Sequence, residues 1–199
     1  MEMPTLLFLL TLIAIIVFSI QIFIKLFKHK SIKSSLGLLI IIMALYSLLW
    51  LFFYFKSTEI TVPLGTVICF DDWCATITKA EQMKTLGDEK PNGQFIILHI
   101  RMSNHARGIA QKPSAPRVHI IDGNGHSFSI SEKGQKALEN LIGKQLPLDE
   151  KLELHQSLET QLVFDIPSDI KSANGLIEEG PFITKLLLQD SKEVFELHY

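Results

Sequence analysis

Residues Leu36 to Phe55 read LGLLIIIMALYSLLWLFFYF, twenty residues without a charged side chain. An α-helix rises about 1.5 Å per residue, so this stretch would span roughly the 30 Å hydrocarbon core of a bilayer. It predicts a transmembrane helix over residues 36–56. The stretch contains no Asp, Glu, Lys, Arg or His, which favours a membrane anchor over a proton relay or a substrate pathway.

A second apolar stretch, Thr5 to Ile24, precedes the first and also lacks charged residues. A secretory signal peptide has a basic start, an apolar core of about 7–15 residues and a small-residue cleavage site. Here the start, Met1–Thr5, contains an acid and no base, the apolar run is longer, and no Ala-x-Ala follows. These features favour a retained transmembrane helix over residues 1–27. The small residues Gly37, Ala44 and Ser47 suggest where the two helices approach each other.

The loop between the two stretches, residues 25–35, contains four Lys and His29. Short basic loops stay on the cytoplasmic side of a membrane. The loop therefore predicts a two-helix transmembrane hairpin in which both termini and residues 57–199 are extracytoplasmic. An alternative interpretation is that the loop binds anionic lipid headgroups; we favour the topology signal, since four lysines are at the low end of such clusters.

Charge is divided unevenly along the 199 residues. Residues 1–56 contain five Lys and one acid, a net charge of +4, so residues 57–199 carry −6 of the chain's total of −2. Nucleic-acid binding needs clustered Lys and Arg, and the acidic outer region excludes it as an expected partner. Residues 57–199 are long enough to bury one ordinary core.

The clearest strand of the outer region is Gln94–Asn104, QFIILHIRMSN. Ile96, Leu98, Ile100 and Met102 alternate with residues of a second face, a period of two that is typical of a strand. The second face also begins apolar, which predicts a central strand covered on both sides.

Turn signals separate further short strands. Asp71-Asp72 and Asp122–Gly125 predict two hairpins, pairing residues 66–70 with 73–78 and residues 117–121 with 127–130. Additional strands are expected at 158–167, 182–189 and 193–198, with an extended connector at 57–64 and loops at 83–93 and 105–116. Seven or eight short strands predict an all-β sandwich over residues 65–199.

One helix is expected within the sandwich. Ser131 is a typical N-cap residue, and Gly143 is typical of a helix end. Ala137, Leu138, Leu141 and Ile142 would form its apolar stripe.

The outer region resembles the telokin-like, immunoglobulin-like domain family of bacterial surface proteins, which is related to an immunoprotective extracellular antigen and has no known function. The resemblance rests on ordered pieces over residues 65–190: Gly65 with Phe70–Trp73, the strand that ends at Asn104, Ile121–Phe128, and Leu162–Pro167. The family usually has a Pro-Gly-Glu type turn before the last piece, whereas His155–Glu159 contains neither Pro nor Gly. The resemblance implies an Ig-like sandwich outside a bacterial inner or plasma membrane, and it implies no catalytic residues.

Cys69 and Cys74 are the only cysteines. If Asp71-Asp72 is a two-residue turn, Cys69 lies opposite Cys74 in a non-hydrogen-bonded pair, close enough for a disulfide. An oxidising compartment would favour the bond. The alternative is two buried thiols that pack as small hydrophobic groups, and the sequence leaves both interpretations open.

Metal and catalytic motifs are weak. His99 and His119 lie in predicted strands and would chelate a metal only if those strands were neighbours and further ligands were present. Asp122–Gly125 begins like a calcium loop, but His126 and Ser127 stand where the EF-hand pattern needs Asp or Asn and Gly. No nucleophile elbow, P-loop or dinucleotide-binding glycine motif is present.

The sequence therefore predicts a non-catalytic, membrane-anchored extracytoplasmic binding module of the cell envelope, without cofactor-binding residues or metal ligands. Its expected partners are the lipid bilayer and an envelope protein. Two alternatives remain: a sensor or accessory subunit of a larger membrane complex, and, more remotely, a metal-dependent enzyme.

Overall fold

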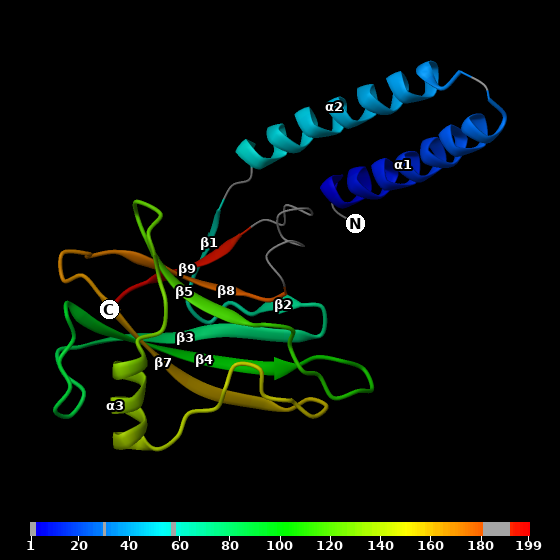
Figure 1. Cartoon of the computed structure of the whole chain (residues 1–199). Helices are drawn as coiled ribbons and strands as arrows, with labels where there is room; N and C mark the ends of the chain where they lie inside the picture. Colours follow the sequence, from blue (N-terminus) through cyan, green and yellow to red (C-terminus); the bar gives the residue numbers. More distant parts are fainter. Residues whose placement is uncertain (1–2, 30, 57–58, 181–191) are drawn as a thin grey trace. The chain divides into compact units, whose positions relative to one another are not determined.

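The computed structural model describes residues 3–29, 31–56, 59–180 and 192–199. They form two compact units, one with two long helices and one with residues 59–180 and 192–199 (Figure 1). Each unit is described by itself. The expected strand at 182–189 lies outside the described residues.

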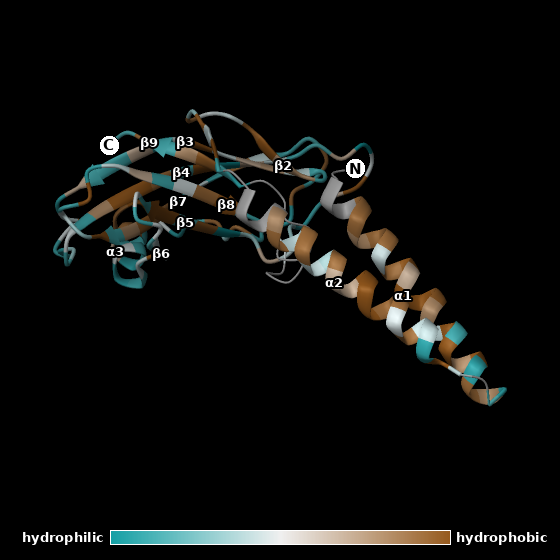
Figure 2. Ribbon diagram, turned by 90° about the horizontal axis from the view of Figure 1, so that it is seen from above, coloured by the Kyte–Doolittle hydropathy of each residue, from teal (hydrophilic) through white to brown (hydrophobic). Residues whose placement is uncertain are grey.

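The helical unit is a hairpin of α1 (Met3–Phe27) and α2 (Lys33–Lys56). Both helices are long and apolar enough to cross a membrane. Polar residues gather at the turn between them, while apolar residues follow both helices (Figure 2). The helices extend into the predicted loop from both sides, and the Lys25 ammonium donates a hydrogen bond of 2.6 Å to the Ser35 hydroxyl across the turn.

The small residues of α2 do not line the contact with α1. A Cβ added at Gly37 would meet no heavy atom within 4 Å. Ala44 and Ser47 are exposed, and the Ser47 hydroxyl donates to the carbonyl of Met43 in its own helix at 2.9 Å. The expectation that these residues let α1 approach closely is therefore wrong, because they lie on other sides of the helix.

The second unit is a sandwich of two sheets and one helix, α3 (Glu132–Ile142). One sheet has the strand order β1-β9-β8-β5-β6 and the other β2-β3-β4-β7. The strands are β1 (Ile60–Val62), β2 (Ile68–Phe70), β3 (Trp73–Met83), β4 (Gln94–Asn104), β5 (Arg117–Asp122), β6 (Ser127–Phe128), β7 (Ser157–Ile166), β8 (Ala173–Glu178) and β9 (Glu193–Leu197).

The main core lies between the two sheets. Alternate residues of β4 from Ile96 to Met102 point into it and are fully buried, opposite Ile120 of β5 and Phe195 of β9. A second cluster, which includes Phe95 and Leu138, fills the space between the outer face of β4–β7 and α3. The predicted central strand covered on both sides is thus confirmed by β4, which pairs with both β3 and β7.

α3 and the segment after it cover the open edge of β7. The Gln135 side-chain amide donates to the carbonyl of Gln161 at 3.0 Å and accepts from the backbone N–H of Val163 at 3.0 Å. The Gln145 side-chain oxygen accepts from the backbone N–H of Gln161 at 3.0 Å. Two glutamine side chains thereby occupy ladder positions that would otherwise be open to another strand.

Local predictions from turn and cap residues are confirmed. β2 pairs with β3 around Asp71-Asp72, and β5 pairs with β6 around residues 123–126. The Ser131 hydroxyl accepts from the backbone N–H of Gly134 at 3.2 Å, and α3 ends at Gly143 with a φ of 96°.

Four details differ from the sequence-based expectations. Ile60–Val62 lies within the expected connector but forms β1, which pairs in parallel with β9. β8 was not expected, and β3 continues past Thr78 to Met83 through an irregularity between Ile77 and Lys79. Leu141 and Ile142, expected in the buried stripe of α3, are 56% and 53% exposed, because α3 buries its apolar face chiefly through Leu138.

Candidate functional site

One cleft of the sandwich lies where β4 begins and β7 ends. It has a volume of about 620 Å³ and is lined by Asn92, Gly93, Phe128, Ser129, Ser131, Asp165, Ile166, Pro167, Ser168 and Asp169. The Asp165 carboxylate forms part of its wall, since it accepts hydrogen bonds from the backbone N–H groups of Asn92 at 2.8 Å and Gly93 at 3.1 Å.

The lining of this cleft is mixed, with polar side chains and one aromatic ring. Hydroxyl, amide and carboxylate groups and the aromatic ring of Phe128 line it, while His, Cys, Lys and Arg are absent from this set of described lining residues.

A second recess of about 580 Å³ lies between the start of β8 and the end of β9. It is lined by Thr61, Gly123, Lys171, Ser172, Ala173, Asn174, Glu196, Leu197, His198 and Tyr199. The Tyr199 hydroxyl is buried and has no hydrogen-bond partner among the residues that the structure describes. Burial raises the pKa of Tyr199 above its ordinary value. The recess holds groups of both charges, with His198 Nε2 3.7 Å from Glu196 Oε2.

The two cysteines join β2 to β3. Cys69 lies opposite Cys74, with 3.9 Å between their Cα atoms, and a disulfide links the two sulfur atoms. Asp71 adopts a φ of 55°, which the predicted tight turn requires. The turn is held from outside, since the backbone N–H of His105 donates to the carbonyl of Asp72 at 2.8 Å. The disulfide therefore restrains the short edge strand β2.

His99 and His119 do not share a site. His99 lies on β4 and His119 on β5, which belong to different sheets. Within the described residues, no group of three or more His, Cys, Asp or Glu side chains could hold a metal ion. The condition for the metal hypothesis, neighbouring strands, is thus not met.

The Asp122 carboxylate stabilises the turn between β5 and β6. Its carboxylate accepts from the backbone N–H groups of Asn124 at 2.9 Å and His126 at 2.8 Å, and Oδ2 lies 2.8 Å from His126 Nδ1. The hydrogen bond to the His126 side chain, with help from these backbone bonds, holds the pKa of Asp122 below its ordinary value. Its role is therefore that of a turn residue.

The lowered pKa of Asp122 predicts a pH-dependent contribution to stability. A carboxyl whose folded pKa is depressed stabilises the fold above its unfolded pKa of about 3.9, and the stabilisation is lost as pH falls through the folded pKa. We expect Asp122→Asn to be less stable than the parent chain at pH 6 and the difference to shrink toward pH 2. Urea unfolding at both pH values measures it; a difference that is constant with pH contradicts the prediction.

A charged ladder crosses the outer face of β3, β4 and β7 and was missed from the sequence. Lys79 pairs with Glu81, and His99 Nε2 lies 3.7 Å from the same carboxylate. The Lys79 hydrogen bond, followed by the charges of Lys79 and His99, lowers the pKa of Glu81. Arg101 donates to Glu159 at 2.8 Å. Lys79 and Glu81 are two positions apart, just beyond the expected end of the strand, and this alternation could have indicated from the sequence that the strand continues.

No family model matches the sequence, and no curated protein matches it. Solved structures similar to the chain include a conserved hypothetical protein from Bacillus anthracis, with 13% identity and a TM-score of 0.49 over 66% of this chain and 93% of that one. The secreted protein MPT63 from Mycobacterium tuberculosis has 11% identity and a TM-score of 0.48, over 70% and 98%. An uncharacterized β-sandwich protein from Clostridium difficile has 13% identity and a TM-score of 0.43, over 71% and 96%.

Proposed function

We propose that this protein is a membrane-anchored, extracytoplasmic interaction module of a bacterial cell envelope. The observation that carries the proposal is the pairing of two apolar helical spans with a β-sandwich that carries polar clefts and loops. The basic turn between α1 and α2 lies on the cytoplasmic side, and residues 57–199 lie outside. Helices without internal ionisable groups act as an anchor.

The sandwich belongs, on this proposal, to the telokin-like, Ig-like class and acts by binding an envelope protein. The polar cleft beside Asp165 and the loops at the sheet ends supply contact surfaces. The lining of that cleft, in which Ser, Asn and Asp side chains occur together with Phe128, supports a binding role.

A second candidate function is an accessory subunit of a larger membrane complex. The observation that favours it is the exposure of Ala44 and Ser47 together with the empty space at Gly37, because small residues allow close approach of transmembrane helices. Replacing Gly37 with Leu distinguishes the two functions. Loss of co-purifying membrane partners supports the accessory role, and an unchanged partner set supports simple anchoring.

Topology is tested with single cysteines on the full chain. In intact cells, a membrane-impermeant maleimide is expected to label Ser168→Cys in the sandwich and to leave Ser31→Cys in the basic turn unlabelled; permeabilised cells label both. Ser31 and Ser168 are both exposed, so accessibility within the protein does not decide the result. Labelling of Ser31→Cys alone in intact cells would overturn the proposed orientation.

The parent chain is the matched control for this experiment. With Cys69 and Cys74 joined in a disulfide, we expect it to bind no maleimide before reduction and two after reduction under denaturing conditions. Mass measurement counts the added groups. Two added groups without reductant would exclude the disulfide and require a cysteine-free background for the topology measurement.

A further inference from the structure

Among residues 59–180 and 192–199, no strand covers one edge of the sheet β2-β3-β4-β7 along half of β3. β2 pairs with β3 only at Trp73, Cys74 and Ala75. The next contact on that side is a single hydrogen bond of 2.8 Å from the backbone N–H of Gly65 to the carbonyl of Ile77. Among the described residues, no strand pairs with residues 78–83 on the side opposite β4 (Figure 1).

The other edges are shorter or covered. β1 and β2 have three residues each and β6 has two. β7 is long, but Gln135 and Gln145 occupy its ladder positions at Gln161 and Val163. An open strand edge is a ready template for pairing with another chain. Within the described part of the sandwich, residues 78–83 are thus an uncovered edge that another chain can extend.

The hydrogen bond from Gly65 shows which residues of this edge point their backbone N–H and C=O groups away from β4. The carbonyl of Ile77 points away from β4, since it accepts from Gly65. The backbone N–H and C=O groups of successive strand residues point alternately to the two sides of the strand. One extra residue lies between Ile77 and Lys79, and Ile77 therefore pairs with Ile100 while Ala80 pairs with Leu98. Ile100 and Leu98 are two residues apart, and the backbone of Ala80 therefore also points to the open side.

The side chains around Ala80 are self-complementary in charge. Lys79 and Glu81 flank Ala80 and already pair with each other on the outer face. Ala80 itself points toward the core and is 7% exposed. A two-fold axis through Ala80 would place each Ala80 opposite its copy and each Lys79 opposite the other copy's Glu81. These two cross-strand pairs would be of the non-hydrogen-bonded kind, in which side chains come closest.

We propose that a second copy of this chain binds here, through antiparallel pairing of residues 78–83 of β3 with the same residues of its partner. The two copies exchange backbone hydrogen bonds at Ala80, and their β2-β3-β4-β7 sheets become one continuous sheet. Lys79 of each copy pairs with the partner subunit's Glu81. The interface is isologous, as a two-fold dimer requires.

Charge variants of the full chain in detergent micelles test the proposal, with polypeptide mass measured by light scattering across a concentration series. We expect a dimer for the parent chain. Lys79→Glu and Glu81→Lys each create two like-charge pairs and should weaken the dimer about tenfold, because like charges directly opposite each other destabilise a cross-strand pair. The double variant Lys79→Glu/Glu81→Lys exchanges the charges and should restore dimerisation.

Lys112→Glu is the matched control, because Lys112 is exposed, pairs with Asp149 and lies outside β3. It should dimerise like the parent chain. A parent chain that is monomeric throughout would overturn the proposal. A dimer that both single reversals leave unchanged would also overturn it, because the association would then use another surface.

Cysteine pairing tests the register. Chains carrying Lys79→Cys and chains carrying Glu81→Cys should form an intermolecular disulfide when they are mixed, and neither should do so alone. Cross-linking within Lys79→Cys alone, or none in the mixture, would contradict pairing about Ala80.

Discussion

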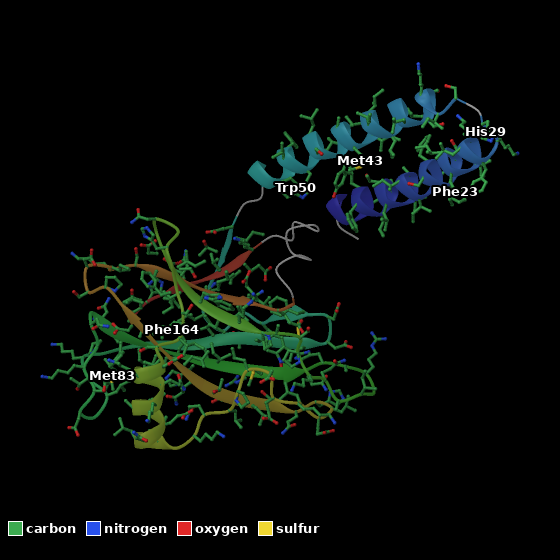
Figure 3. All side chains as sticks on the ribbon, viewed as in Figure 1. Phe23, His29, Met43, Trp50, Met83 and Phe164 are labelled. Carbon is green, nitrogen blue, oxygen red and sulfur yellow. A yellow bond between two sulfur atoms is a disulfide. The ribbon has the colours of Figure 1, made fainter. Side chains whose placement is uncertain are left out.

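Replacing Phe164 with alanine is expected to lower the free energy of unfolding of the sandwich by about 3–5 kcal/mol. Phe164 lies on β7 and is fully buried in the core between the sheets (Figure 3). It faces Ile96 of β4 and forms an isolated bridge with Ile130, next to the N-cap of α3. Truncation removes buried apolar area and leaves a cavity where the two sheets and the entry to α3 meet.

Urea unfolding of the full chain, followed by Trp73 fluorescence, measures this loss. Trp73 is 2% exposed and reports on the same core. Ile109→Ala is the control: Ile109 is 64% exposed, and we expect its replacement to change stability by less than about 0.5 kcal/mol. A loss below about 1 kcal/mol for Phe164→Ala would mean that the site collapses without a cavity.

Gly93→Ala is expected to lower the free energy of unfolding by about 1–3 kcal/mol for a different reason, because the added Cβ would overpack against backbone atoms. A Cβ at Gly93 would lie 2.2 Å from the carbonyl oxygen of Ile166 and 2.8 Å from the Cα of Pro167. Neither atom can rotate away as a flexible side chain would. Relief requires the end of β7 to move, which would also disturb the hydrogen bonds from Asn92 and Gly93 to Asp165.

Gly108→Ala is the matched control for this substitution, because a Cβ there would meet nothing within 4 Å. Both variants make the same chemical change in a loop, so their difference in unfolding midpoint isolates the steric clash. Equal midpoints for the two variants would contradict the prediction.

Elements with local signals could be predicted from the sequence. The pair Asp71-Asp72 tolerates the left-handed backbone of a tight turn, which set the register of Cys69 opposite Cys74. Ser131 offered a cap oxygen for α3, and the two-residue period marked β4. Each of these features depends on residues close together in the chain.

Elements that pair with strands far away in the chain could not be predicted from the sequence. Ile60–Val62 is too short to show a period, and it forms β1 only because β9, more than 130 residues later, offers an edge. In β8, Gly175 weakens the strand pattern, yet glycine is needed there because a Cβ would lie 2.3 Å from Ile77 Cδ1 across the core. The second half of β3 carries Lys79, Glu81 and Gln82, and pairing with β4 makes it a strand.

The clefts and the strand histidines also depend on residues that are far apart in the chain. The sequence assigned no residue beside Asp165 to a binding cleft, because the walls of this cleft come from the starts and ends of strands far apart in the chain. His99 and His119 looked alike as strand histidines, and only the assignment of β4 and β5 to different sheets separated them.

By itself, the sequence determined the two apolar helices, the basic turn, the hairpins and the cap of α3, because charge, hydropathy and turn chemistry act over a few residues. Only the tertiary structure decided which strands are neighbours, which edges are covered and which glycines have no room for a side chain. Those properties depend on pairing and packing between residues that the chain brings together only when it folds. The open edge at Ala80 is one of them.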